Sequence, residues 1–202
     1  MRRKLVVATR NQKKLRELQD LLDNTGLEML TLNDLPSVPE VEEDGQTFAE
    51  NAIKKARTVA EATGLLTLAD DSGLEVDALG GLPGVHSARF AGEPADDGKN
   101  NAKLLAMLQG VPDEQRTARF RCVIAIAVPG GETYLAEGAC QGRITHKARG
   151  EGGFGYDPLF VVDEYGLTFA ELPPEVKNRI SHRGQALSQA RELIASLWEE
   201  MS

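Results

Sequence analysis

The chain has 202 residues, of which 41% are apolar, and its 23 basic and 31 acidic residues give a formal net charge of −8. This length and apolar content suit one large α/β domain, or two small lobes that share a core. The negative charge argues against binding to nucleic acid or to an anionic membrane, because both depend on basic surface. A net charge of −8 is still compatible with one small basic pocket.

Neither a membrane span nor a disulfide framework is indicated. The longest apolar runs, such as residues 123–128, are far short of the roughly 20 residues that cross a bilayer, and no apolar stretch follows the basic residues 2–4 as in a signal peptide. Cys122 and Cys140 lie in separate segments without the spacing of a zinc site. We therefore expect a cytoplasmic protein with two buried thiols.

The first elements follow a strand, turn and helix order. Residues 4–8 form a strand signal that runs into a turn at residues 9–11, and leucines then recur at helical spacing at Leu15, Leu18, Leu21 and Leu22. A second strand is expected at residues 28–32, followed by a loop that ends at Gly45.

A helix is expected from Thr47, because Thr47 and Glu50 have the spacing of a capping box and apolar residues then recur on one face. Residues 65–69 form a buried strand signal, so the next two residues, Asp70 and Asp71, are expected at its carboxyl end.

The second half of the chain predicts, in order, a helix at residues 95–109, an alternating strand at 117–128, a hairpin into a strand at 132–137, a strand at 156–162 and a final helix across 186–198. No repeat, low-complexity stretch or linker divides residues 1–202. We expect a single α/β domain with a mixed sheet.

Asp70 and Asp71 carry the strongest chemical signal. Adjacent carboxylates at a strand end can bind a divalent metal and polarise a water, which cleavage of a phosphoanhydride requires. Paired aspartates also occur as helix caps or solvated turn residues. The acidic run at residues 40–44 favours the metal site if it converges with Asp71, or remains a solvated loop if it does not.

A glycine-rich segment, residues 150–155, matches G-x-G-x-x-G, but a strand signal rather than a helix follows, so we reject a dinucleotide-binding motif. Its glycines allow close backbone approach to a ligand and expose Phe154 as a stacking face for a base, unless the segment is a plain flexible loop. The basic segment 177–183 suits phosphate or a carbonyl-rich base, or is an exposed turn in which Ser181 caps a helix.

The junction at residues 9–14 lies where α/β sheets usually bind ligands, and it offers hydroxyl, amide and ammonium donors. It lacks the glycines of a phosphate-binding P-loop. Ser72 lacks the G-x-S-x-G turn of a serine nucleophile.

Several motifs together resemble one family across nearly the whole chain. In order they are Thr9-x-Asn11-x-x-Lys14, Glu42-x-x-Gly45-x-Thr47-Phe48-x-Glu50-Asn51-Ala52, Ala69-Asp70-Asp71-Ser72-Gly73-Leu74, Pro83-Gly84-Val85 with Ser87-Ala88-Arg89, Gly153-Phe154-Gly155-Tyr156-Asp157-Pro158 and Ile180-Ser181-His182-Arg183. This set is similar to the inosine/xanthosine triphosphate pyrophosphatase family. Their common order makes the joint resemblance far more specific than any one motif.

The resemblance implies a homodimer with an elongated central mixed sheet, two α/β lobes and a nucleotide-binding cleft between them. It also implies magnesium-dependent hydrolysis of inosine, deoxyinosine and xanthosine triphosphates (ITP, dITP and XTP) to the monophosphate and pyrophosphate. Such an activity keeps deaminated purines out of nucleic acid.

By resemblance, Asp71 is the general base, and Glu42 and Asp71 hold the magnesium. The expected substrate-binding residues are Thr9, Arg10, Asn11, Gln12, Lys13 and Lys14 on the triphosphate, Ser72, then Phe154, Gly155, Tyr156 and Asp157 along the base, and Lys177, His182 and Arg183 at the end that reads it.

This sequence departs from the family pattern at Val176, where an acidic residue is usual, and at His86, where tyrosine is common. Neither position is assigned to catalysis. Two alternatives stay open: a catalytically inactive nucleotide-binding regulator, and a pyrophosphatase of other modified nucleotides.

Overall fold

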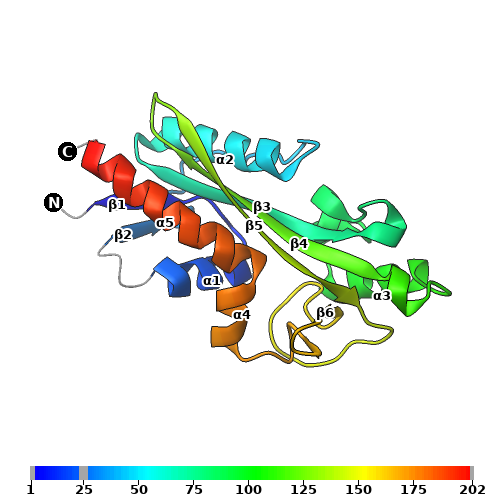
Figure 1. Ribbon diagram of the computed structural model, residues 1–202. Helices are drawn as coiled ribbons and strands as arrows, with labels where there is room; N and C mark the ends of the chain where they lie inside the picture. Colours follow the sequence, from blue (N-terminus) through cyan, green and yellow to red (C-terminus); the bar gives the residue numbers. More distant parts are fainter. Residues whose placement is uncertain (1–2, 23–26, 201–202) are drawn as a thin grey trace. The chain divides into compact units, whose positions relative to one another are not determined.

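The computed structural model describes residues 3–22 and 27–200. Its elements, in chain order, are β1 (Lys4–Val7), α1 (Gln12–Leu22), β2 (Glu28–Thr31), α2 (Phe48–Thr63), β3 (Thr67–Val76), the 3-10 helices η1 (Asp77–Leu79) and η2 (Gly84–Arg89), α3 (Asp97–Met107), the 3-10 helix η3 (Asp113–Gln115), β4 (Thr117–Ala127), β5 (Thr133–Ile144), β6 (Phe160–Val162), β7 (Leu167–Thr168), α4 (Pro174–Ile180) and α5 (His182–Glu200) (Figure 1). The expected α/β fold is confirmed.

The strands form one mixed sheet in the order β2-β1-β3-β4-β5-β6-β7. β1 pairs in parallel with β2 and β3, whereas β6 pairs antiparallel with β5 and β7. A tight turn joins β4 to β5, in which the N–H of Gly131 donates to the carbonyl of Val128. The predicted mixed sheet is therefore present.

The chain divides into two compact units, each assembled from separate stretches. The first unit contains Met1–Asp71, Cys122–Gly138 and Arg183–Ser202, and the second contains Ser72–Arg121 and Ala139–His182. Strands β3, β4 and β5 each contribute residues to both units.

In the first unit, α1 and α5 pack against one face of the sheet, where Leu5 and Val7 of β1 join a core that extends to Trp198. Val6 is also buried, and alternation along the strand turns it to the opposite face. Figure 1 shows α5 in front of the strands and α2 behind them. The predicted capping box of α2 is present, since Thr47 and Glu50 each accept the other's backbone N–H.

The second unit has its own core, in which helix α3 and β4 to β7 enclose an aromatic cluster. Phe120, Phe160 and Phe169 have ring centres 4.7 to 5.5 Å apart. Rings at this spacing contribute beyond their buried area. His182, one of the predicted base-binding residues, stacks on this cluster.

The predicted strand at residues 65–69 was too short. β3 continues through both aspartates to Val76, because the residues after Asp71 keep the period-two pattern and place Leu74 and Val76 in the core of the second unit. The acids therefore lie in the middle of a strand and not at its end.

Two later strands also differ from the expectation. β5 extends beyond residue 137 to Ile144, and Gly142 permits this because a Cβ there would lie 2.2 Å from the carbonyl oxygen of Val161 in β6. In contrast, residues 156–159 form a turn, since the N–H groups of Asp157 and Leu159 bond to carbonyls three residues earlier.

Helices α3 and α5 were expected, although α5 begins earlier, at His182. Cys122 and Cys140 are buried free thiols, as predicted. Burial raises the pKa of Cys122 to about 12, so it stays protonated at neutral pH. No helix in the described ranges is long and apolar enough to cross a bilayer.

Candidate active site

Asp70 lies at the centre of a buried ion cluster in the first unit. Its side chain is 1% exposed, and its carboxylate lies 3.1 Å from the ammonium of Lys14 and 3.6 Å from the guanidinium of Arg183. Burial opposes ionisation of Asp70, but the charges of Lys14, Arg183 and Lys55 outweigh that effect and hold the pKa of Asp70 well below its usual range. Asp70 is thus ionised at neutral pH.

Asp71 points to the opposite face of β3, and its environment differs. Burial raises the pKa of Asp71, and the negative charge of Glu43 acts in the same direction. Lys14, Lys55 and a hydrogen bond from Asn51 partly offset this rise. Two neighbouring carboxylates therefore have opposite pKa shifts, an arrangement common where acid–base chemistry occurs.

Helix α2 connects the acidic loop to β3. Asn51 donates to Asp71 (2.9 Å) and accepts the backbone N–H of Gly45 (2.8 Å). One turn later, Lys55 donates to the carbonyl oxygen of Asp70 (2.6 Å) and to the carboxylate of Glu43 (3.0 Å). Asn51 and Lys55 thereby bring residues 43–45 to the paired aspartates.

Within the acidic run, Glu43 is the residue that Lys55 links to the backbone of Asp70 and whose charge acts on the pKa of Asp71. Glu42, the residue expected to share the metal, is an exposed neighbour in the loop. Across residues 3–22 and 27–200, no three His, Cys, Asp or Glu side chains gather as a closed metal site. Magnesium is usually held by one or two carboxylates completed by waters and phosphates, so Asp71 and Glu43 fit it.

The first strand-to-helix junction lies in the same unit. Asn11 accepts the backbone N–H groups of Lys13 (3.0 Å) and Lys14 (3.2 Å), and its own N–H bonds to Thr9. These contacts begin α1. Lys14 points toward Asp70, whereas Arg10, Gln12 and Lys13 are exposed, together with Asn11 itself.

Arg183 was predicted to read the base beside Lys177 and His182. Its side chain is 4% exposed within the first unit, where the guanidinium pairs with Glu17 and Asp70. The other two residues belong to the second unit. α5 begins at His182, so consecutive side chains at its start point in different directions, and the base-reading role of Arg183 stays a prediction.

In the second unit, Asp157 bonds to the backbone of the glycine-rich segment 150–155, called the Phe154 loop below. One oxygen of Asp157 accepts the backbone N–H of Phe154 (2.9 Å) and the ammonium of Lys177 (2.8 Å). Lys177 also lies 5.3 Å from the ring centre of Phe154 and 5.8 Å from that of Phe169. This places a buried cation beside an aromatic face.

His182 stacks on the aromatic cluster, with its ring centre 4.7 Å from that of Phe120 and an interplanar angle of 11°. Tyr156 is also buried, and its hydroxyl donates to the carbonyl of Ser87 (2.7 Å). Of the predicted base wall, Phe154 and Gly155 are half-buried, whereas Tyr156 and Asp157 lie inside. Ser72, half-buried on β3, begins the same unit.

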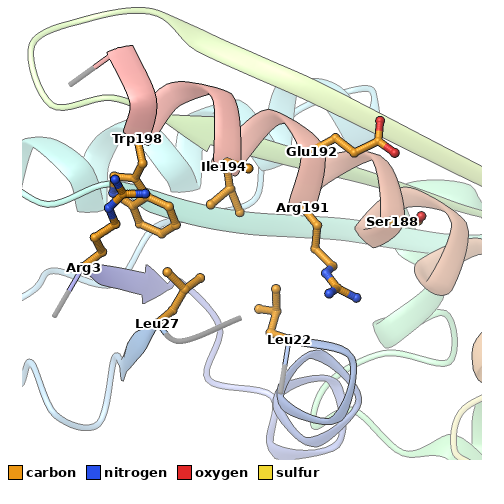
Figure 2. A pocket seen from close by; sticks show the side chains of 9 residues that line it. Arg3, Leu22, Leu27, Ser188, Arg191, Glu192, Ile194 and Trp198 are labelled. Atoms are coloured by element: carbon orange, nitrogen blue, oxygen red, sulfur yellow. The ribbon is translucent and has the colours of Figure 1, made fainter. Parts of the chain in front are cut away.

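A separate cavity of about 500 Å³ lies between α5, the end of α1 and the start of β2 in the first unit (Figure 2). Its walls are Arg3, Leu22, Leu27, Ser188, Arg191, Glu192, Ile194, Ala195 and Trp198. No predicted site residue lines it, so this cavity is not the candidate active site.

Sequence reasoning named neither Asn51 nor Lys55 as a site residue. Their spacing of four residues on a capped helix directly after the acidic loop was the available signal. That signal alone does not show which way the helix face turns.

The seven-stranded mixed sheet with flanking helices and the buried pair Asp70 and Asp71 define an α/β protein with a candidate acid–base site. The chain belongs to the Ham1 family, whose model matches residues 5–193.

Named relatives and a solved structure agree with that membership. The chain is 62% identical to a dITP/XTP pyrophosphatase of Desulforamulus reducens, over 96% of this chain and 97% of the relative, and 59% identical to one of Geobacter sulfurreducens, over 94% and 95%. Its fold matches a Ham1 protein from Coxiella burnetii with a TM-score of 0.88 and 44% identity, over 96% of this chain and 99% of the other.

Proposed function

We propose that this chain hydrolyses non-standard purine nucleoside triphosphates (ITP, dITP and XTP) to the nucleoside monophosphate and pyrophosphate. Two relatives that are 59% and 62% identical are named for dITP and XTP. The observation that carries the proposal is the pair Asp70 and Asp71, in which one carboxylate is a fixed anion and the other has a raised pKa. Such a pair suits general base catalysis.

Asp71 would hold a magnesium ion together with a glutamate of the acidic loop. The sequence predicts Glu42 as that glutamate, whereas the effect of Glu43 on the pKa of Asp71 favours Glu43. When bound, the ion supplies positive charge to the phosphate oxygens. A divalent cation beside two carboxylates also offsets their mutual repulsion.

Asp71 is proposed to accept the proton of a water that attacks the α-phosphorus. A bond forms between that water oxygen and phosphorus, the bond to the bridging oxygen breaks, and pyrophosphate leaves with the electron pair. The raised pKa of Asp71 makes its carboxylate a stronger base than an ordinary aspartate. Asp70 holds Lys14 in place as the cation nearest the reacting phosphates.

Half-buried Thr9 and the exposed side chains of residues 10–13 (Arg10, Asn11, Gln12 and Lys13) are proposed to bind the triphosphate, since they lie at the start of α1, where backbone N–H groups favour anions. In the second unit, Phe154 is proposed to stack on the purine, and Lys177 and His182 to donate to its 6-carbonyl. An adenine amino group there would leave such donors unpaired, which costs roughly 1–3 kcal/mol each.

We further propose a cytoplasmic homodimer, on the basis of the family resemblance. An inactive nucleotide-binding regulator would have little need for Asp71 as a general base or for the buried charges of Asp70 and Lys14. A pyrophosphatase of other modified nucleotides would share Asp71 and differ at Phe154 and Lys177.

The test is to supply ITP, XTP, GTP and ATP side by side with magnesium and to identify the products. We expect monophosphate and pyrophosphate from ITP and XTP, much slower reaction with ATP, and loss of activity with a chelator. Asp71→Asn should retain nucleotide binding and lose at least about 100-fold in kcat. Near-normal turnover by Asp71→Asn would contradict the assigned base, and nucleotide binding without hydrolysis by the wild-type chain would favour the regulator.

A further inference from the structure

Helix α3 holds both polar groups of the Gly155 backbone. The carboxylate of Asp97 accepts the N–H of Gly155 (3.0 Å), and the side-chain amide of Asn101 donates to its carbonyl oxygen (3.0 Å). Asp97 and Asn101 are four residues apart, so they lie on the same face of the helix. An acceptor and a donor one turn apart thus match the N–H and C=O of a single residue.

The two hydrogen bonds of Asp97 and Asn101 to Gly155, called the clamp below, lie next to Phe154. Phe154 lies between Gly153 and Gly155, whose φ angles of +70° and +61° favour glycine. A Cβ at Gly153 would lie 2.0 Å from a carboxylate oxygen of Asp157, which also accepts the N–H of Phe154. The backbone of Phe154 is therefore fixed by Asp157 on one side and by α3 on the other.

The same end of α3 supports the neighbouring loop. Asn100 is 2% exposed; it donates to the carbonyl of Ala88 (3.0 Å) and accepts the N–H of Ala91 (2.7 Å). The charge of Asp97 also adds to burial in raising the pKa of Tyr156, which shows that its carboxylate lies near that ring. The start of α3 thus serves as a rigid support for the Phe154 loop.

We propose that Asp97 and Asn101 are positioning residues that hold Phe154 ready to stack on the purine base, without contacting the nucleotide themselves. This inference rests on the proposed function. A loop ordered in advance loses less conformational entropy when the ligand binds. Loss of the clamp therefore weakens binding of the base more than it slows the reaction at the phosphate.

The experiment measures KM and kcat for ITP in Asp97→Ala and Asn101→Ala, with Lys99→Ala as the matched control because Lys99 is exposed in the same first turns of α3. Each lost hydrogen bond should raise KM by about 3- to 10-fold, with kcat within about twofold of wild type. Asp97→Asn keeps an acceptor oxygen and should restore most of the affinity. Asn101→Asp places a carboxylate against a carbonyl and should exceed the effect of Asn101→Ala.

Thermal unfolding of each variant separates the change in KM from a general loss of stability. The decisive comparison is made in a chain that already carries Phe154→Ala. If Asn101 acts through Phe154, adding Asn101→Ala to Phe154→Ala leaves KM unchanged within about twofold. Additive effects on KM in that double variant, or an equal effect of Lys99→Ala, would overturn the inference. Absence of ITP hydrolysis by the wild-type chain would instead contradict the proposed function.

Discussion

The side-chain amide of Asn51 donates a hydrogen bond of 2.9 Å to the carboxylate of Asp71. This bond favours the ionised form of Asp71 and opposes the rise in pKa caused by burial. Since the other end of the Asn51 amide accepts the N–H of Gly45, one residue adjusts the proposed base and also holds the acidic loop.

Replacing Asn51 with alanine should therefore move the acid limb of the activity profile. Without the hydrogen bond, the pKa of Asp71 rises further, so the active carboxylate form appears only at higher pH. We expect the acid limb of kcat/KM to shift to higher pH and the free energy of unfolding to fall by about 1–3 kcal/mol. Arg57→Ala, at an exposed position of α2, is the control and should leave the limb in place. A shift to lower pH would contradict this role of Asn51.

Substitution of Glu43 and of its neighbour Glu42 tests which of the two glutamates binds magnesium. Both glutamates are exposed, but Glu43 acts on the pKa of Asp71 and pairs with Lys55. Glu43→Gln should raise the magnesium concentration for half-maximal activity by about 10- to 100-fold, a range typical of groups that support a metal site. Glu42→Gln should change it little. The reverse order, measured by magnesium titration of ITP hydrolysis, would restore Glu42 as the second metal ligand.

Asp70 should matter chiefly for stability. Asp70→Asn leaves the charges of Lys14 and Arg183 buried near a neutral side chain, and breaking such a buried arrangement costs about 3–5 kcal/mol. Asp77→Asn is the control, since the side chain of Asp77 is 49% exposed.

The pH dependence of this loss follows from the lowered pKa of Asp70. A carboxyl group whose folded pKa lies below its unfolded value stabilises the fold above that unfolded value, near 3.8, and loses the contribution as the pH falls through the folded pKa. Urea unfolding should therefore show the full difference between wild type and Asp70→Asn at neutral pH and a smaller one in strong acid. A constant difference would exclude this ionic contribution.

We expect substitution of Lys177 to change mainly the selectivity for the base, and substitution of Arg183 to change mainly the stability of the fold. Lys177→Met removes a cation beside Phe154, and we expect the preference for ITP over ATP in kcat/KM to fall by about 10-fold. Arg183→Met removes a partner of Asp70, so it should lower the unfolding free energy by about 3–5 kcal/mol, more than it alters that preference. The measurements are kcat/KM for both nucleotides and urea unfolding. A larger loss of selectivity in Arg183→Met would support Arg183 as a residue that reads the base.

Local patterns predicted much of the fold. The capping box at Thr47 is present as expected, and β4 forms where its alternation predicted a strand, because both signals depend on residues within a few positions of one another. The burial of β4 alternates only as far as Cys122, and residues 122–127 are all buried. The end of β3 was missed, since an aspartate pair resembles a turn unless the packing of Leu74 and Val76 beyond it is known.

The sequence alone determined the set of polar side chains available for chemistry and the order of motifs that marks the family. Only the tertiary structure decided which of them meet: Asn51 reaches Asp71 across 20 positions, and Arg183 reaches Glu17 across 166. Local periodicity shows which face of a helix is buried, but not which distant charge it faces. That choice depends on how the strands and helices pack, which is why the structure was needed to show that Glu43 acts on the pKa of Asp71 and that Arg183 pairs with Asp70.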